Sequence, residues 1–265
     1  MKIQNERKPH FSVSQLTTYL QCPLAYYFQY ELGLAWKVTP SAVAFGKCMH
    51  RAIETMNVCR KQGQEVSQDD LLRSFSRQWA DTIEAGHVGW KKPEEPAELL
   101  TKGQCLLEEY YRQFRKCQYS DVELGFRLPI LDAATGLYVQ SRDIVGYIDA
   151  IDNGSTIVEY KTTGRTPNQH QVDSDLQLTL YSWAYRMLYG IPEDRIIVVN
   201  LVKTKEPKIE VVETHRKEED YTKLIGLMQQ VIRAVDQRLF YPNPIGGFGC
   251  GTCNYAEECR KEWPI

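Results

Sequence analysis

The sequence has no run of apolar residues long enough to cross a bilayer, which takes about 20 of them in a helix. Met1 to His10 are polar and no apolar segment follows them, so we expect no signal peptide. Both absences predict a cytoplasmic protein without membrane contact. The chain also lacks a strong net charge, −2 at pH 7, so any binding to nucleic acid needs a local basic surface. Internal repeats and low-complexity linkers are missing as well.

The composition is typical of a soluble globular protein. The 265 residues allow one large domain or two small ones, and 43% of them are hydrophobic and 25% charged. Eight cysteines without a secretion signal argue against a disulfide framework. Four of them fall inside helical patterns, where they are most simply small buried or half-buried residues: Cys48, Cys59, Cys105 and Cys117.

The first part of the chain is predicted to be helical. A first helix opens near Phe11, with Ser12 or Ser14 as its capping residue, and Cys22-Pro23 ends it and starts a second one. Apolar residues three or four positions apart then predict three longer helices, at residues 42–60, 70–85 and 97–116.

From Asp121 the hydrophobic period changes to two residues, which indicates strands. Strands are predicted from residue 121, from 137, at 147–151 and 156–161 around an Asn153-Gly154 turn, and at 196–203 and 208–213. Helices are predicted at 171–189 and 218–240. We therefore expect a single α/β domain, 1–265, with a mainly antiparallel sheet. Its parts are a helical N-terminal part, 1–120, a catalytic core, 121–215, and a C-terminal helix with a cysteine-rich loop, 216–265.

The predicted hairpin carries charged residues that point to chemistry. Side chains alternate between the two faces of a strand, so Glu159 and Lys161 share one face while Val158 and Tyr160 take the other. With Asp149 from the neighbouring strand, two carboxylates would suit Mg²⁺ or Mn²⁺, and the lysine would hold an attacking water or developing phosphate charge. The alternative is a surface hairpin with an ordinary Glu–Lys pair, because a bare E-x-K pattern is common.

The remaining four cysteines form a candidate metal centre. Cys250, Cys253 and Cys259 lie in a tail rich in glycine, which permits the tight turns that bring thiolates together. Cys22, at the helix break, is the natural fourth ligand. Four thiolates hold either structural Zn²⁺ or an iron–sulfur cluster. Because zinc sites usually come as two closely spaced pairs, one distant cysteine and a compact triplet favour a 4Fe–4S cluster.

The ordered set of motifs resembles the PD-(D/E)xK nucleases. Asp149 matches the first acidic residue of that family and Glu159-Tyr160-Lys161 its E-x-K, although Ile148 stands where the family name has proline. The other matching pieces are Ser14-x-Leu16-x-x-Tyr19-x-x-Cys22-Pro23, Gly46-x-x-x-His50, Gly146-x-x-Asp149, Gln177-x-x-x-Tyr181 and the terminal cysteines. They are similar to the RecB-like exonucleases with an iron–sulfur cluster, a branch that includes the AddB nuclease domain and the exonuclease of CRISPR adaptation modules.

The resemblance implies a restriction-endonuclease-like core, which is a central mixed sheet flanked by helices. A helical N-terminal elaboration and a C-terminal iron–sulfur loop held by Cys22, Cys250, Cys253 and Cys259 would complete the fold. It further implies that Mg²⁺ or Mn²⁺ binds to His50, Asp149, Glu159 and the backbone carbonyl of Tyr160, with Lys161 as the catalytic lysine.

Two further residues gain a role from the resemblance. Gln177 and Tyr181 are one helical turn apart, and in the family such a pair orients the active site and contacts the nucleic-acid strand. Judged by their own spacing alone, they are equally well a hydrogen-bonded pair of partly buried residues. His50, taken alone, is more simply a packed or surface histidine of an amphipathic helix.

The function implied is a metal-dependent DNA exonuclease acting on single-stranded ends, in DNA repair and recombination or in CRISPR adaptation. A second hypothesis is an adaptor of nuclease fold that docks on an integrase or a helicase. A third is a zinc-stabilised DNA-binding module without catalysis.

Overall fold

The computed structural model describes residues 10–91, 93–131, 138–152, 155–245 and 250–263. These form two compact units, and strands β4 (Tyr119–Leu131) and β5 (Tyr138–Asp152) contribute to both. Unit 1 comprises Met1–Lys37, Gly125–Gly146 and Arg216–Ile265; unit 2 comprises Val38–Leu124 and Tyr147–His215. The expected boundary after residue 215 falls between the units, whereas the one after residue 120 does not. That the whole chain is one domain stays a prediction.

Unit 2 is built on a mixed sheet. Beyond β5, its strands are β6 (Thr156–Thr163), β7 (Arg195–Val202) and β8 (Lys208–Thr214), side by side in that order. β5 and β6 are antiparallel, β6 and β7 are parallel, and β7 and β8 are antiparallel again. The mixed sheet is confirmed. It contains more parallel pairing than the mainly antiparallel sheet that the sequence predicted. The reason is that a helical crossover joins β6 to β7, and such a connection brings strands together in parallel.

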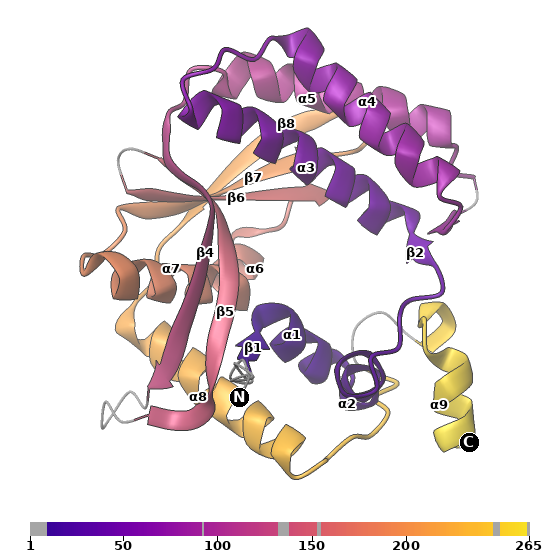
Figure 1. Ribbon diagram of the computed structural model, residues 1–265, viewed down its shortest axis with the longest axis vertical. Helices are drawn as coiled ribbons and strands as arrows, with labels where there is room; N and C mark the ends of the chain where they lie inside the picture. Colours follow the sequence, from indigo (N-terminus) through magenta and orange to yellow (C-terminus); the bar gives the residue numbers. More distant parts are fainter. Residues whose placement is uncertain (1–9, 92, 132–137, 153–154, 246–249, 264–265) are drawn as a thin grey trace, which may run out of the picture. The chain divides into compact units, whose positions relative to one another are not determined.

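Helices cover both faces of this sheet (Figure 1). One face packs against the helical layer of α3 (Ser41–Lys61), α4 (Gln68–Glu84) and α5 (Pro96–Phe114). The other face carries α7 (Leu176–Tyr189) and, beside it, the short α6 (Gln169–Asp173). The three long helices match the predicted ranges to within two residues, because their apolar period is unbroken. Two very short strands, β2 (Thr39–Pro40) and β3 (Val88–Gly89), pair in parallel next to α3.

The core of unit 2 lies between the helical layer and the sheet. Its largest fully buried side chains come from α3, α4 and α5, and β6 and β7 supply the opposing wall: Phe45, Met49, Ile53, Phe75, Trp79, Leu106, Val158, Tyr160, Val199 and Leu201. Each fully buried large apolar side chain of this kind contributes about 1.5–3 kcal/mol. This core fixes α3 beside β6, where charged residues of the predicted hairpin lie.

Three expectations about the elements are corrected. The helix predicted at 171–189 is interrupted, because the Asp175 carboxylate accepts hydrogen bonds from the N–H groups of Gln177 (2.7 Å) and Leu178 (3.3 Å) and so caps a new helix, α7. The strands predicted from 137 and at 147–151 are parts of one long strand, β5. The last helix, α8 (Glu218–Asp236), ends four residues earlier than predicted. The expected Asn153-Gly154 turn lies outside the described residues, although the strands on either side are confirmed.

Unit 1 joins segments that are far apart in the sequence. Strand β1 (His10–Ser12) pairs in parallel with β5 at residues 143–145, a strand that the sequence did not predict. Ser12 caps α1 (Val13–Gln21) as expected, since its Oγ accepts the N–H of Gln15 at 3.2 Å. Cys22 then separates α1 from α2 (Pro23–Tyr26), with Pro23 at the first helical position as predicted. A π-helical turn, Tyr27–Glu31, follows and was not predicted.

The N-terminal helices of unit 1 are tied to the segment after α8. Tyr19 donates its hydroxyl to the carbonyl of Leu239 at 2.7 Å, and the rings of Tyr26 and Tyr27 stack on Phe240. Tyr26 is fully buried, so this ring belongs to the core. Within the described part of the chain, no helix combines the length and apolar character needed to span a membrane.

Candidate active site

The candidate site begins where the ladder between β5 and β6 ends. Ala150 pairs with Val158 and Ile151 with Ile157, and the next residues towards the site are Asp149 and Glu159. The N–H of Tyr160 donates to Oδ2 of Asp149 at 2.9 Å. The carboxylate therefore takes a backbone donor of the neighbouring strand, which fixes its orientation. Asp149 and Glu159 are buried, with 8% and 2% of their surface exposed.

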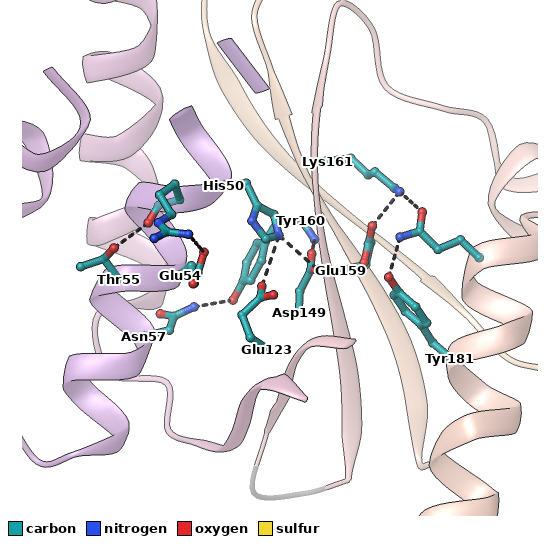
Figure 2. A network of polar contacts seen from close by, with 12 residues as sticks. His50, Glu54, Thr55, Asn57, Glu123, Asp149, Glu159, Tyr160, Lys161 and Tyr181 are labelled. Carbon is teal, nitrogen blue, oxygen red and sulfur yellow. Dashed lines mark hydrogen bonds and ion pairs between the residues drawn. The ribbon is translucent and has the colours of Figure 1, made fainter. Parts of the chain in front are cut away.

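Helix α3 brings His50 to this point from the helical layer (Figure 2). Nε2 of His50 lies 3.1 Å from Oδ1 of Asp149 and 3.6 Å from Oε1 of Glu123, which comes from β4. His50, Glu123 and Glu54, one turn further along α3, each offer a ligand atom within 4.8 Å of the others. Of the predicted metal ligands, His50 contacts Asp149, Asp149 accepts the N–H of Tyr160, and Glu159 is the neighbour of Tyr160 in β6; within the described residues the group that shares one centre is His50, Glu54 and Glu123.

Glu54 and Glu123 were missed by sequence reasoning. Glu54 follows His50 by four residues, a spacing that places both on one face of a helix, so a signal was available. Glu123 gave none, because a charged residue between Val122 and Leu124 is what any half-exposed strand shows. In the structure Glu123 has a φ of +50°, in the left-handed region that is unfavourable for this residue type. Such strain concentrates at functional sites, where surrounding structure maintains it.

The site is electrostatically unbalanced without a cation. The hydrogen bond to Asp149 raises the pKa of His50 to about 9, against the opposing effect of burial. Burial, and next to it the charge of Asp149, raise the pKa of Glu159 although Lys161 lowers it. Burial raises the pKa of Glu123 to about 7, with Asp149 and Glu54 acting in the same direction. Buried carboxyl groups whose pKa values are raised by each other form the environment that a divalent cation relieves.

One atom tests directly whether a cation fits. Oε2 of Glu159 is buried and has no hydrogen-bond partner, which is costly for a carboxylate oxygen unless a cation or proton satisfies it. The donor set around it is carboxylate oxygen and imidazole nitrogen. Oxygen ligands suit Mg²⁺, and the added imidazole suits Mn²⁺. The residues present therefore fit the predicted metal.

Lys161 lies on the side of β6 that faces α7 (Figure 2). Its Nζ is 2.6 Å from Oε1 of Glu159 and donates to Oε1 of Gln177 at 2.5 Å, and Nε2 of Gln177 donates to the Tyr181 hydroxyl at 2.7 Å. Burial lowers the pKa of Lys161, but the charge and hydrogen bond of Glu159, together with the charges of Asp175 and Asp149, outweigh it, and the net pKa is raised. The prediction that Gln177 and Tyr181 share a helix face is confirmed, and so is the pairing of Glu159 with Lys161 on one strand face. Their catalytic roles stay predictions.

The four predicted cluster cysteines all lie in unit 1. Cys22, Cys253 and Cys259 pack against Leu24, Phe28 and Tyr255, and Cys250 opens the short helix η2 (Cys250–Thr252) just before Cys253. Cys259 belongs to α9 (Ala256–Glu262). Burial raises the pKa of the Cys259 thiol, and the charges of the other three cysteines add to the effect, so these three lie within electrostatic reach of Cys259.

The sheet is mixed and carries helices on both faces. An acidic residue, a Glu-x-Lys pair and a histidine meet where two of its strands separate. Together these features define a nuclease core. The family model of the PD-(D/E)XK nuclease superfamily matches residues 10–260. The chain belongs to this superfamily. The fold class and the family resemblance inferred from the motifs are therefore confirmed.

Two known proteins show how far the similarity extends. One relative, from Ruminiclostridium cellulolyticum, is a subunit of an ATP-dependent helicase/deoxyribonuclease, and it is 26% identical over 212 residues. These residues are 67% of this chain and 17% of that protein, so the chain spans less than a fifth of the relative's length. A crystal structure of a protein named "Putative exonuclease" from Eubacterium rectale aligns with a TM-score of 0.60 and 14% identity. The alignment covers 100% of this chain and 95% of that one, and it supports the fold.

His50 gives a direct test of the site's electrostatics. In the metal-free protein we expect its imidazole to titrate at about 9, and in Asp149→Asn closer to its ordinary value of 6.5, because the hydrogen bond to Asp149 is the largest cause of the shift. Since the folded-state pKa is raised, the stabilisation by the charged pair is fully present below about pH 6.5 and disappears as the pH rises through about 9. NMR titration of the histidine ring protons in EDTA measures both midpoints. An equal midpoint in the two proteins would show that Asp149 does not hold the proton on His50.

Proposed function

We propose that the protein is a metal-dependent exonuclease that hydrolyses DNA from single-stranded ends. The observation that carries the proposal is the buried, unpartnered Oε2 of Glu159 beside Asp149, Lys161 and His50, in a chain of a nuclease superfamily. These four side chains come from three elements that converge at the end of one strand ladder. A structural role alone does not explain why two carboxylates would be buried next to each other there.

The proposed ligands for Mg²⁺ or Mn²⁺ are His50, Asp149, Glu159 and the backbone carbonyl of Tyr160. When bound, the cation supplies Lewis-acid stabilisation of the phosphodiester and makes a water molecule a better nucleophile at neutral pH. Asp149 is already oriented for this role by the N–H of Tyr160. Binding requires the neutral imidazole of His50, so the proton held between His50 and Asp149 has to leave.

Lys161 is proposed to act on the attacking water or on the phosphate. Its ammonium group is held between Glu159 and Gln177, and its side chain is 32% exposed, so it can reach a substrate. Gln177 and Tyr181 would keep the ammonium group in place through the chain of hydrogen bonds that runs from Nζ to the tyrosine hydroxyl. A preorganised cation costs no reorganisation when charge develops on the phosphate.

For the four cysteines we propose a 4Fe–4S cluster. The support is the ligand spacing, because one distant cysteine, Cys22, and a compact triplet in the tail differ from the two closely spaced pairs of usual zinc sites. Sγ of Cys253 also accepts the N–H of Tyr255 at 3.4 Å, a contact of the kind that tunes cluster thiolates.

The relatives guide the proposal on substrate and partner. A component of a helicase/deoxyribonuclease acts beside a motor that separates strands, which supports single-stranded DNA as the substrate and a helicase as the partner. An integrase partner in CRISPR adaptation and the cytoplasmic location stay predictions. The adaptor hypothesis differs in one respect, since it predicts that the isolated chain does not hydrolyse DNA.

Labelled DNA tests the activity. We expect the isolated chain with Mn²⁺ to shorten linear single strands labelled at the 5′ or the 3′ end, to leave closed circular single strands intact, and to be inactive in EDTA. The end from which the label is released gives the polarity, and duplex DNA of the same sequence gives the strand preference. Circular DNA cut as fast as linear DNA would show an endonuclease. Failure to cut any of these substrates would favour the adaptor.

A further inference from the structure

Behind the active site, four polar side chains meet inside the apolar core of unit 2. The hydroxyl of Tyr160 lies 3.0 Å from that of Tyr119 and 3.1 Å from that of Tyr110, and it accepts a hydrogen bond from Nδ2 of Asn57 at 3.1 Å. Oδ1 of Asn57 lies 3.3 Å from the Tyr110 hydroxyl. We name Asn57, Tyr110, Tyr119 and Tyr160 the hydroxyl cluster. All four residues are buried.

The hydroxyl cluster connects four elements, since its members come from α3, α5, β4 and β6. Its neighbours in the core are apolar, for example Met56, Leu107 and Val158. Apolar replacements of buried hydrogen-bonded groups are often neutral for stability, so stability alone does not account for polar groups here. Hydrogen bonds do provide something that apolar packing lacks, because they depend on direction and distance and therefore favour one register of the elements that they join.

The register of α3 decides the geometry of the metal site. Asn57 follows His50 by seven residues, about two turns, so both lie on the face of α3 that looks towards the sheet. Tyr160 stands between Glu159 and Lys161, and its N–H holds Asp149. The two contacts between α3 and the site, Asn57 to Tyr160 and His50 to Asp149, therefore connect the helix to the sheet at two points (Figure 2). Apolar packing alone, or the contact of His50 alone, would fix this register less well than the two contacts together.

We propose that the hydroxyl cluster is a positioning device that sets α3 against β6 and thereby holds His50 at the distance from Asp149 and Glu159 that the cation requires. The inference rests on the proposed metal-dependent function. In this inference Asn57, Tyr110 and Tyr119 affect the cation only indirectly, through the position of His50. Displacing His50 by a fraction of an ångström lowers the affinity for the cation even if the protein stays folded, because metal sites depend on ligand distances.

The test measures Mn²⁺ affinity and thermal stability in the same variants. Tyr160→Phe removes only the central hydroxyl oxygen, and Asn57→Leu removes the amide while keeping the volume. The matched control is Leu107→Ala, a truncation in the same core that leaves the hydroxyl cluster intact. Mn²⁺ binding is followed by the EPR signal of free Mn²⁺, without DNA and without turnover, and the melting temperature is recorded in EDTA.

We expect Tyr160→Phe and Asn57→Leu to weaken Mn²⁺ binding by about tenfold or more, the effect usual for partners that orient metal ligands. Leu107→Ala should lower the melting temperature at least as much, yet bind Mn²⁺ like the unmodified protein. If Asn57→Leu fails to fold, Tyr160→Phe decides the question alone.

Two results would overturn the inference. The first is unchanged Mn²⁺ affinity in Tyr160→Phe, which would leave the hydroxyl cluster with a structural role only. The second is an equal loss of affinity in Leu107→Ala, which would show that any loosening of the core disturbs the site. Failure of the proposed function would give a different result. In that case the unmodified protein and Asp149→Asn would bind the same amount of Mn²⁺.

Discussion

Replacing Asp149 by Asn is expected to lower the rate of DNA hydrolysis by at least about a thousandfold. The amide keeps the volume and can still accept the N–H of Tyr160 through its oxygen, but it removes the negative charge next to His50. A site with one carboxylate fewer binds a divalent cation poorly, so neither the water nor the phosphate charge is stabilised. The melting temperature in EDTA should change little, because Glu159 and Glu123 lose a repelling neighbour while His50 loses its charged partner.

The control for this variant is Asp152→Asn on the same strand. Asp152 accepts the N–H of Thr156 at 2.9 Å, so the same chemical change is made three residues further along β5. Its activity should be close to that of the unmodified protein. The assignment of Asp149 would be wrong if Asp149→Asn kept near-normal activity. Unfolding of Asp149→Asn would instead identify a structural residue.

Replacing Cys22 by Ala is expected to produce the largest loss of stability. Structural metal centres contribute on the order of 10 kcal/mol of binding free energy to folding, and removing one of four thiolates forfeits much of it. We expect the unmodified protein, purified without oxygen, to bind about four iron atoms per chain, and the variant to lose iron, visible absorbance and several degrees of melting temperature. The residues of the candidate active site stay chemically intact, because Asp149, Glu159 and Lys161 lie in unit 2 and Cys22 in unit 1.

Cys105→Ala is the matched control for this experiment, since Cys105 is an exposed thiol on α5. It should retain iron and the melting temperature. One zinc and no iron in the unmodified protein would refute the iron–sulfur cluster while leaving the tetrathiolate site. Equal metal content in Cys22→Ala would remove Cys22 from the ligand set.

Much of the fold could be predicted because its signals are local. The three long helices of unit 2 have an unbroken apolar period, and Ser12, Cys22 and Pro23 mark helix ends by their own chemistry. The single helix expected at 171–189 was wrong because the apolar period continues across Asp175, whose capping role depends on where the backbone turns. The parallel pairing of β6 with β7 was not visible either, since it is a property of the connection and not of the strands.

The candidate site was predictable only in part, for a similar reason. Asp149, Glu159 and Lys161 stand out because charged residues interrupt a β-branched hairpin. His50, Gln177 and Tyr181 came from the order of motifs along the chain.

Glu123 was not predicted because its role depends on a backbone conformation, a φ of +50°, that brings a strand residue towards α3. The hydroxyl cluster is equally invisible in the sequence. Tyr110, Tyr119 and Tyr160 look like ordinary core aromatics until the tertiary structure brings their oxygens together.

The division of the chain into units has a consequence for biosynthesis. Every residue of the candidate active site precedes Arg216, whereas Cys250, Cys253 and Cys259 follow it and, in the proposed cluster, would have to reach Cys22. Since compact units fold as they leave the ribosome, unit 2 can be complete while Cys22 is still a free thiol waiting for its partners. Insertion of the proposed cluster would then be a late step of maturation. If the cluster proposal holds, a cell short of iron would accumulate chains with a folded unit 2 and an unfinished unit 1.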